Sequence, residues 1–382
     1  MKLDNPDDCV DSDAWLGLWT AFRTIWTEEA DRIGVVVGCS GGADSVALVR
    51  LIEAARRQTA SPASLVIAHL NHGLRGEDSD RDEAHVRSLA EELGREVVVQ
   101  RQKQSRQAPV QYDDDPDDRG GSGQRLDSDE ASLRQARRRF LVQTAKQHGC
   151  RYIALAHTAD DQAETVLHHV LRGTGSAGVS GMAISTPIEI DFIVRRPLLN
   201  VRRTLVRQAL TEIRQTWRED LSNQESRYTR NWIRNEILPA IRQRLPGVDA
   251  SLIRLAENQS QTDELLTRFG RQWFDAFVSC VLGSDSSRWL RIQTSFDRDA
   301  SRLWKHDHEL ARDRAVITRG LQWMFQQYQL PMRDMTQTHW HRLCDLVLKP
   351  HDEPEMRSVG HLPGRMEMKS ELHAVWIGPI RL

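Results

Sequence analysis

The fold is decided by the stretch 35-VVVGCSGGADSVALVRL-51, in which an apolar run breaks into a polar loop and then resumes with a different period. The run has the character of a buried strand, and the segment from Asp44 onward has the period of a helix. A strand-to-helix junction exposes unpaired backbone N–H groups and the positive end of a helix dipole. The stretch therefore predicts an anion site, and phosphate is the anion that fits it best.

The chemistry of this loop differs from that of a Walker A loop. A Walker A loop needs a lysine after its second glycine, and no cation follows the glycines here. Backbone N–H groups, hydroxyls and a carboxylate able to hold Mg²⁺ suit the pyrophosphate that leaves when ATP donates AMP. The plain alternative is a glycine-rich turn with a helix cap. The loop residues are Ser40, Gly41, Gly42, Ala43, Asp44 and Ser45.

The segments around the loop alternate between strand and helix patterns. Such alternation predicts βαβ units and an α/β fold with a doubly wound, Rossmann-like parallel sheet covered on both faces. The expected strands are 33–37, 64–70, 96–100 and 152–157, and the expected helices are 13–28, 44–57, 80–93, 130–148 and 160–171.

The chain divides into three predicted parts: a helical extension over 1–28, the doubly wound domain over 29–220, and a smaller, mainly helical region over 221–382. An acidic, Gly- and Ser-rich stretch at 101–129 interrupts the domain and reads as a mobile insertion. In the last part, Pro239 predicts a kink or a break in a helix. The alternating end of the chain predicts a hairpin with its turn near Ser370.

Composition narrows the function classes. The 52 Lys and Arg nearly balance the 54 Asp and Glu, so any nucleic-acid surface must come from local segregation of charge. The five cysteines form no CxxC pair and have no zinc or iron–sulfur spacing. The polar, acidic start and the lack of a long apolar run predict a cytoplasmic protein that does not enter membranes.

An acidic helix face follows the fourth expected strand. His157, Asp161, Glu164 and His168 are spaced four, three and four, which places them on one face near the carboxyl end of a strand, where open α/β sheets bind ligands. This pattern fits a metal site or a pocket for a substrate cation. It also fits a solvated helix start with acids favoured by the dipole.

Two arginine-rich segments are further candidate binding sites. Arg134 and Arg137 lie on one face of an expected helix, where they could clamp a phosphate or the activated base. Residues 195–244 hold twelve arginines, no lysine and five acids, a local charge of +7. Within them Arg227, Arg230 and Arg234 form a stripe suited to a phosphate backbone, although a charged run is often only a solvated face.

Together these motifs resemble the pyrophosphate-loop (PP-loop) enzymes, or N-type ATP pyrophosphatases, and within them the tRNA(Ile)-lysidine synthase family. Leu133 and Arg138 depart from the family pattern, where Ala and Tyr are usual. The similar segments are HLNHGLRGEDSDRDE (69–83), LAHTADDQAETVLHHVLRGTGSAGVSGM (155–182), RRPLL (195–199), WREDLSN (217–223) and YTRNWIRNEILP (228–239).

The resemblance implies an ATP-dependent ligase that joins free L-lysine to C2 of the wobble cytidine in the isoleucine tRNA with a CAU anticodon. ATP would first adenylate the cytidine, and lysine would then displace AMP. A tRNA thiolase of the 2-thiocytidine type and a non-catalytic tRNA-binding module are the alternatives. A homodimer is the default expectation.

The resemblance also implies residue roles. Asp44 would hold Mg²⁺, and the Ser40–Ser45 loop with His69 would bind ATP. Asp161 and Glu164 would bind lysine. Its ammonium must lose a proton before it can attack, and either Asp161 or His157 would take it. The catalytic set is Asp44, Asp161, His157 and Arg137, and the tRNA-binding set is Arg134, Arg227, Arg230 and Arg234.

Overall fold

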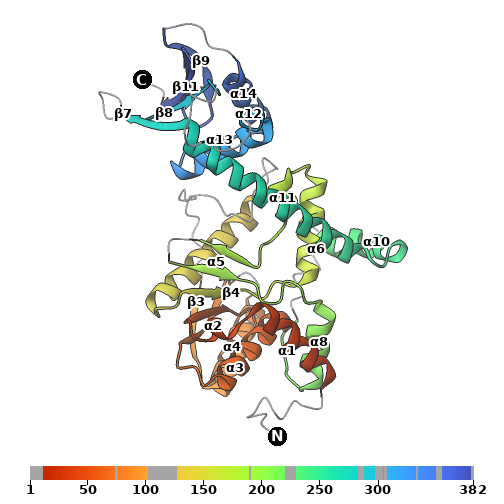
Figure 1. Cartoon of the computed structure of the whole chain (residues 1–382). Helices are drawn as coiled ribbons and strands as arrows, with labels where there is room; N and C mark the ends of the chain where they lie inside the picture. Colours follow the sequence, from red (N-terminus) through yellow and green to blue (C-terminus); the bar gives the residue numbers. More distant parts are fainter. Residues whose placement is uncertain are drawn as a thin grey trace. The chain divides into compact units, whose positions relative to one another are not determined.

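The chain divides into two compact units, and the boundary along the sequence falls inside one long helix. The computed structural model describes residues 12–73, 76–101, 127–188, 191–219, 229–282, 288–296, 304, 308–332, 334–349 and 355–379. The first unit runs to Glu257 and the second begins at Asn258, inside α11 (Val248–Phe277) (Figure 1). None of the described helices is long and apolar enough to cross a membrane.

A six-stranded sheet of order β3-β2-β1-β4-β6-β5 forms the centre of the first unit. All neighbouring strands are parallel except β5 and β6, which are antiparallel. The parallel part of the sheet confirms the expected α/β fold. β4 ends three residues earlier than the sequence suggests. The strands are β1 (Val35–Gly38), β2 (Leu65–Asn71), β3 (Glu96–Arg101), β4 (Tyr152–Ala154), β5 (Ser185–Pro187) and β6 (Ile193–Arg195).

The strand order creates a ligand-binding crevice. From β1 the chain winds outward through β2 to β3 and then returns to place β4 on the other side of β1. Open α/β sheets bind ligands at such a switch point, beyond the carboxyl ends of the two strands. The Ser40–Ser45 loop follows β1 and the acidic segment follows β4, so both motifs lie at this edge.

Helices cover both faces of this sheet. Val35 and Val37 pack with α1, α3, α4 and α8, while Val36 and Val66 pack with α5 on the opposite face. This burial on alternate sides explains the continuous apolar run of β1. The helices are α1 (Asp13–Ile25), α2 (Glu28–Asp31), α3 (Ala43–Gln58), α4 (Glu77–Leu93), α5 (Asp127–Gln147), α6 (Ala159–Leu171), α7 (Ser176–Val179) and α8 (Arg203–Glu212).

The helical segment around Pro239 joins the first unit. α9 (Thr229–Trp232) continues into the π-helical turn η3 (Ile233–Ile237) and then into α10 (Leu238–Arg244). Pro239 has no N–H to donate to the carbonyl four residues earlier, as an α-helix requires. The turn just before it, η3, has the wider π-helical form. The sequence placed a boundary near residue 220. The first compact unit of the structure extends to Glu257, and α9 and η3 contact α6 within it.

The second unit combines helices with a five-stranded antiparallel sheet of order β7-β8-β11-β10-β9. The hairpin is confirmed, with its turn after Glu371, but the other three strands were not expected. The strands are β7 (Val278–Leu282), β8 (Arg288–Gln293), β9 (Arg357–Leu362), β10 (Met366–Glu371) and β11 (Ala374–Pro379), and the helices are α12 (His308–Ala311), α13 (Arg314–Gln327) and α14 (Gln337–Leu348).

The expected insertion at 101–129 lies mostly outside the described residues. Arg101 still belongs to β3, and α5 already begins at Asp127. The mobility of this segment therefore stays a prediction.

Candidate active site

The phosphate loop has a backbone that only glycine accommodates well. Gly41 has φ +90°, a conformation that L side chains rarely adopt. The backbone conformation and not the space favours glycine, because a Cβ there would make an ordinary contact of 3.5 Å with Val86 Cγ2. The Gly41 carbonyl accepts a hydrogen bond of 2.9 Å from the Arg218 N–H. No side chain of the described residues caps α3, so its first N–H groups are left for an anion.

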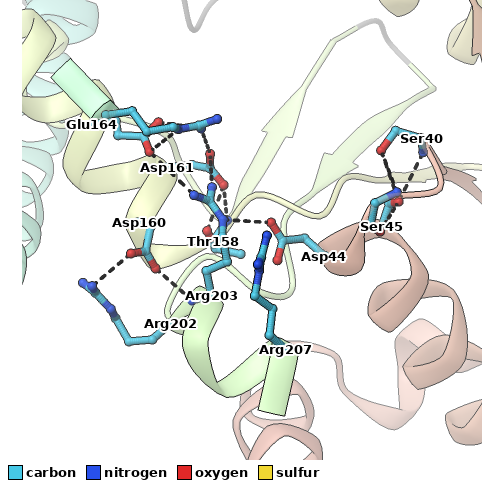
Figure 2. Close-up of polar contacts among 12 residues, drawn as sticks. Ser40, Asp44, Ser45, Thr158, Asp160, Asp161, Glu164, Arg202, Arg203 and Arg207 are labelled. Atoms are coloured by element: carbon cyan, nitrogen blue, oxygen red, sulfur yellow. Dashed lines mark hydrogen bonds and ion pairs between the residues drawn. The ribbon is translucent and has the colours of Figure 1, made fainter. Parts of the chain in front are cut away.

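Two serines hold the loop from within. Ser45 Oγ donates to the Gly42 carbonyl at 2.9 Å and accepts from the Ser40 N–H at 3.2 Å, and the two hydroxyl oxygens lie 3.3 Å apart (Figure 2). His69 on β2 contacts the Cys39 carbonyl through Nδ1 at 2.8 Å. Burial lowers the pKa of His69. In this structure His69 therefore supports the loop as a neutral ring, and its contact with ATP stays a prediction.

The acidic segment is fixed by the start of α6. Asp161 Oδ2 accepts from both the backbone N–H and the hydroxyl of Thr158, each at 2.9 Å, which forms a capping box. This anchors one oxygen of Asp161 and turns the other toward the crevice. Glu164 follows on the same helix face and is 2% exposed. The predicted shared face of these two carboxylates is present.

An arginine that the sequence analysis did not nominate connects the two motifs. Arg203, at the start of α8, donates through Nε to Asp44 Oδ2 at 3.2 Å and through Nη2 to Asp161 Oδ1 at 2.9 Å (Figure 2). Its Nη1 lies 3.8 Å from Glu164 Oε1. One guanidinium thus joins the phosphate loop to the acidic helix. The twelve-arginine stretch contains Arg203, but nothing in that pattern distinguishes it from its neighbours.

Two further arginines cover the acidic pair. Arg234 donates to both oxygens of Glu164 at 2.7 Å and to Asp161 Oδ1 at 3.0 Å. Arg230 Nε reaches Glu164 Oε2 at 3.4 Å. Burial by itself would raise the pKa of Asp161, but Arg203 and Arg230 outweigh it and hold that pKa well below its usual range. Both members of the predicted phosphate stripe that the structure describes therefore contact carboxylates here.

A second ion-pair network fixes α8 against α6. Asp160 accepts from the Arg203 N–H at 2.8 Å and lies 2.9 Å from Arg202 Nη2 (Figure 2). Arg202 also contacts Asp249 at 3.0 Å, and Arg242 donates to both oxygens of Asp249 at 2.8 and 2.9 Å. These contacts tie the N-terminal end of α11 and the helix α10 to the same edge of the sheet.

Asp44 Oδ1 and His157 Nδ1 are among the buried polar atoms at this edge that have no partner within the described residues. Burial raises the pKa of Asp44 to about 6, although Arg203 opposes the shift. Burial also lowers the pKa of His157 to about 3, so its ring is neutral at neutral pH. A carboxylate oxygen with no protein partner fits a Mg²⁺ ion that keeps phosphate and water oxygens as its other ligands.

The other candidates lie at the margin of this site or outside the described residues. Arg134 and Arg137 are on the exposed face of α5. Arg134 is close enough to His157 to contribute to its lowered pKa. Arg227 lies outside the described residues. The described chain has no cluster of three His, Cys, Asp or Glu suited to a metal, so the acidic helix face does not support the metal interpretation.

Comparison with known proteins decides the family. A family model described as a PP-loop domain matches residues 20–241. The tRNA(Ile)-lysidine synthase of Rhodopirellula baltica is 38% identical over 361 residues, which cover 88% of this chain and 86% of that protein. The chain belongs to the tRNA(Ile)-lysidine synthase family. A family member from Thermus thermophilus is 38% identical over 248 residues, 65% of this chain and 43% of that protein.

Solved structures support the fold. The structure titled U34-tRNA thiolase NcsA from Methanococcus maripaludis, with its [4Fe-4S] cluster, superposes with a TM-score of 0.50 at 19% identity, over 64% of this chain and 80% of that one. This likeness shows the fold alone. The PP-loop match contains Asp44, Asp161, Glu164 and the three arginines that contact them, so the network lies in the family's characteristic domain.

Proposed function

We propose that the protein forms lysidine: it joins lysine to C2 of the wobble cytidine of the CAU-anticodon isoleucine tRNA and converts ATP to AMP and pyrophosphate. One observation carries this proposal beyond the family likeness. Asp44 of the phosphate loop and the Asp161–Glu164 pair contact the same guanidinium, that of Arg203. The loop that would bind phosphate and the carboxylates that would bind a cationic amine therefore lie around a single guanidinium.

The phosphate loop accounts for the first half of the reaction. The N–H groups at the start of α3 and the hydroxyls of Ser40 and Ser45 would receive the pyrophosphate as the cytidine C2 oxygen attacks the α-phosphorus. Asp44 would hold Mg²⁺ through the oxygen that has no protein partner. When bound, Mg²⁺ neutralises phosphate charge and so favours departure of the pyrophosphate.

The acidic pair accounts for the second half. Asp161 and Glu164, which lie on one face of α6, would hold the ε-ammonium of lysine near the activated carbon. The two groups that could take the proton from the ammonium are both weak bases in this structure. Both oxygens of Asp161 already accept hydrogen bonds, and burial lowers the pKa of His157 to about 3, although its Nδ1 has no partner among the described residues. Either group would receive the proton only as the new C–N bond makes the amine more acidic.

The basic residues form the proposed contact with tRNA. Arg134 and Arg137 on α5, together with Arg227, Arg230 and Arg234, would meet backbone phosphates or the activated base. The region 221–382 would extend this contact, and a homodimer in the cytoplasm remains the expectation for the assembly and its location.

Sulfur transfer is the alternative closest in chemistry. A thiolase of the 2-thiocytidine type would form the same adenylate, but by family resemblance it would use paired cysteines. The described cysteines, Cys39, Cys150, Cys280 and Cys344, are all free, and Cys39 is buried with a raised pKa. A thiol of that kind reacts poorly. A non-catalytic tRNA-binding module would have no need for the linked Asp44, Asp161 and Glu164.

The nature of the ATP cleavage tests the proposal. The full chain is incubated with Mg²⁺, ATP, lysine and a CAU-anticodon tRNA(Ile) transcript, and the products are separated. Adenylation predicts tRNA-dependent AMP and pyrophosphate. Asp44→Asn should abolish both products, while Asp13→Asn, which changes an exposed carboxylate of α1, should not. Release of ADP and phosphate, or no tRNA-dependent turnover, would contradict the proposal.

A further inference from the structure

The segment 215–219, which follows α8 and includes the start of the WREDLSN motif, lies against the phosphate loop. The Arg218 N–H donates to the Gly41 carbonyl at 2.9 Å. A Cβ on Gly42 would lie 3.8 Å from the carbonyl oxygen of Arg218. The backbone of residue 218 therefore lies beside both glycines of the loop.

The side chain of Arg218 ties this segment to α4. Its Nε donates to Asp82 Oδ1 at 3.0 Å, and the side chain of Asp82 is only 9% exposed. The backbone of Asp82 also faces the loop, because a Cβ on Gly41 would lie 3.6 Å from the Asp82 carbonyl oxygen. Asp82 and Arg218 thus both lie beside Gly41, and their side chains bind each other.

Further contacts hold the 215–219 segment in place. His85 of α4 is hydrogen-bonded to the backbone of Thr216. Gln215 Oε1 accepts from Arg50 Nε of α3, and Trp217 packs against the core of the first unit. The segment that carries residue 218 is therefore anchored to both helices beside the phosphate loop.

The bond to the Gly41 carbonyl also sets the direction of the next N–H. A trans peptide is planar, so the C=O of Gly41 and the N–H of Gly42 point in opposite directions. Because the carbonyl points at Arg218, the Gly42 N–H points away from it. That N–H is 3.4 Å from Ser40 Oγ, longer than a usual hydrogen bond, and Gly42 is the N-cap of α3. The Gly42 N–H is therefore one of the donors that the start of α3 offers to an anion.

We propose that Arg218 is a positioning residue: its contact with Asp82 holds residue 218 against Gly41 and so directs the Gly42 N–H at the pyrophosphate part of bound ATP. This inference rests on the proposed function, because it takes the Ser40–Ser45 loop as the pyrophosphate site. Glycine has more conformational freedom than any other residue, so Gly41 needs a contact from outside the loop to stay at φ +90°. Arg218 supplies that contact and acts on the phosphates only through the loop backbone.

Binding of pyrophosphate and of ATP, each with Mg²⁺, to the full chain tests this role. Isothermal titration calorimetry compares the wild type with Arg218→Gln and Asp82→Asn. We expect each variant to bind both ligands about tenfold more weakly, which corresponds to about 1.4 kcal/mol. Arg218→Lys keeps a donor for Asp82 and should lie between the wild type and Arg218→Gln. The double variant Asp82→Asn/Arg218→Gln should bind no more weakly than the weaker single variant, because both changes break the same contact, and additive losses would contradict the proposal.

The two single variants separate positioning from a charge effect. Arg218→Gln removes a positive charge near the phosphates and Asp82→Asn removes a negative one, so charge alone predicts weaker binding for the first and tighter binding for the second. Positioning predicts weaker binding for both. Arg81→Gln changes an arginine of α4 that is 62% exposed and contacts Glu77 and Asp78, and it should bind both ligands as the wild type does. Unchanged or tighter binding by Asp82→Asn would overturn the proposal.

The outcomes also distinguish this inference from the proposed function. The side chain of Arg218 is 36% exposed, so Arg218→Gln should remain folded, which circular dichroism checks. Binding by the wild type with equal affinities in all variants overturns the role of Arg218 and leaves lysidine formation standing. A wild type that binds neither pyrophosphate nor ATP overturns the loop as the pyrophosphate site, and the positioning role with it.

Discussion

Replacing Arg203 by glutamine removes the guanidinium that joins the phosphate loop to the acidic helix. The change breaks a hydrogen bond of 3.2 Å to Asp44 and one of 2.9 Å to Asp161. Hydrogen bonds to charged groups contribute about 1.5–3 kcal/mol each, so the two together set an upper range of about 3–6 kcal/mol.

Two features of the site reduce this figure. Asp161 keeps Arg234 at 3.0 Å. Asp44, whose pKa burial already raises to about 6, can take up a proton once its cation is gone. We therefore expect Arg203→Gln to lower the free energy of unfolding by about 2–4 kcal/mol, toward the cost of breaking a buried pair. Arg203→Lys keeps the charge but has no planar guanidinium. Its free energy of unfolding should lie between those of the wild type and Arg203→Gln.

Arg207 provides the matched control on the same helix. It lies one turn after Arg203, and its contact with Glu219 joins side chains that are 48% and 56% exposed. An exposed pair contributes about 0–1 kcal/mol. Arg207 also acts on Asp44 through its charge, so Arg207→Gln should cost a little stability, but much less than Arg203→Gln. Urea unfolding followed by tryptophan fluorescence compares the variants. Equal stabilities of Arg203→Gln and Arg207→Gln would refute the idea that the bridge holds the site together.

Three further predictions concern single positions. Glu164→Gln should suppress lysine transfer and leave tRNA-dependent AMP formation in place, because the phosphate loop is untouched; loss of both activities would show that Glu164 also serves the first step. Gly41→Ala should cost about 1–3 kcal/mol of stability and weaken ATP binding, since its φ is +90°; unchanged ATP affinity would place the phosphate elsewhere. Burial lowers the pKa of His157 from 6.5 to about 3, so the unfolded chain binds a proton at pH values where the folded ring stays neutral. The stability of the folded protein is therefore complete above pH 6.5 and is lost progressively as the pH falls toward 3. His157→Asn should flatten the fall in Tm between about pH 6 and 4, and an unchanged slope would assign that fall to other groups.

Much of the site could be predicted because the carboxyl ends of neighbouring parallel strands meet at one edge. The Ser40–Ser45 loop and the segment beginning at His157 each follow a strand, and the order β2-β1-β4 brings them to the switch point. The helical spacing of Asp161 and Glu164 placed both on one face, and the capping box at Thr158 holds that face in position.

The contacts between charges could not be predicted from local spacing. Arg203 and Asp44 are 159 positions apart in the chain, and Arg234 and Glu164 are 70 apart. The stripe of Arg230 and Arg234 has the same spacing whether its guanidinium groups face solvent, phosphate or carboxylates. Only packing of α9 and η3 against α6 brings them to the acids.

The strands of the second unit were missed for a different reason. β7 has four exposed residues out of five, so its sequence lacks the alternation that marks a half-buried strand. Its partner β8 could not be predicted from its own sequence, because β8 is stabilised by pairing with β11, which is distant in the chain. The hairpin of β10 and β11 is local and was visible in the sequence.

Incorporation of labelled lysine into tRNA tests the central claim most directly. The protein is incubated with Mg²⁺, labelled lysine and a CAU-anticodon tRNA(Ile) transcript, with and without ATP, and mild alkali then removes any aminoacyl ester. The account predicts alkali-stable label that requires ATP and is absent when uridine replaces the wobble cytidine. AMP formation without stable label would contradict lysine as the nucleophile, and would direct attention to a sulfur donor at the same centre.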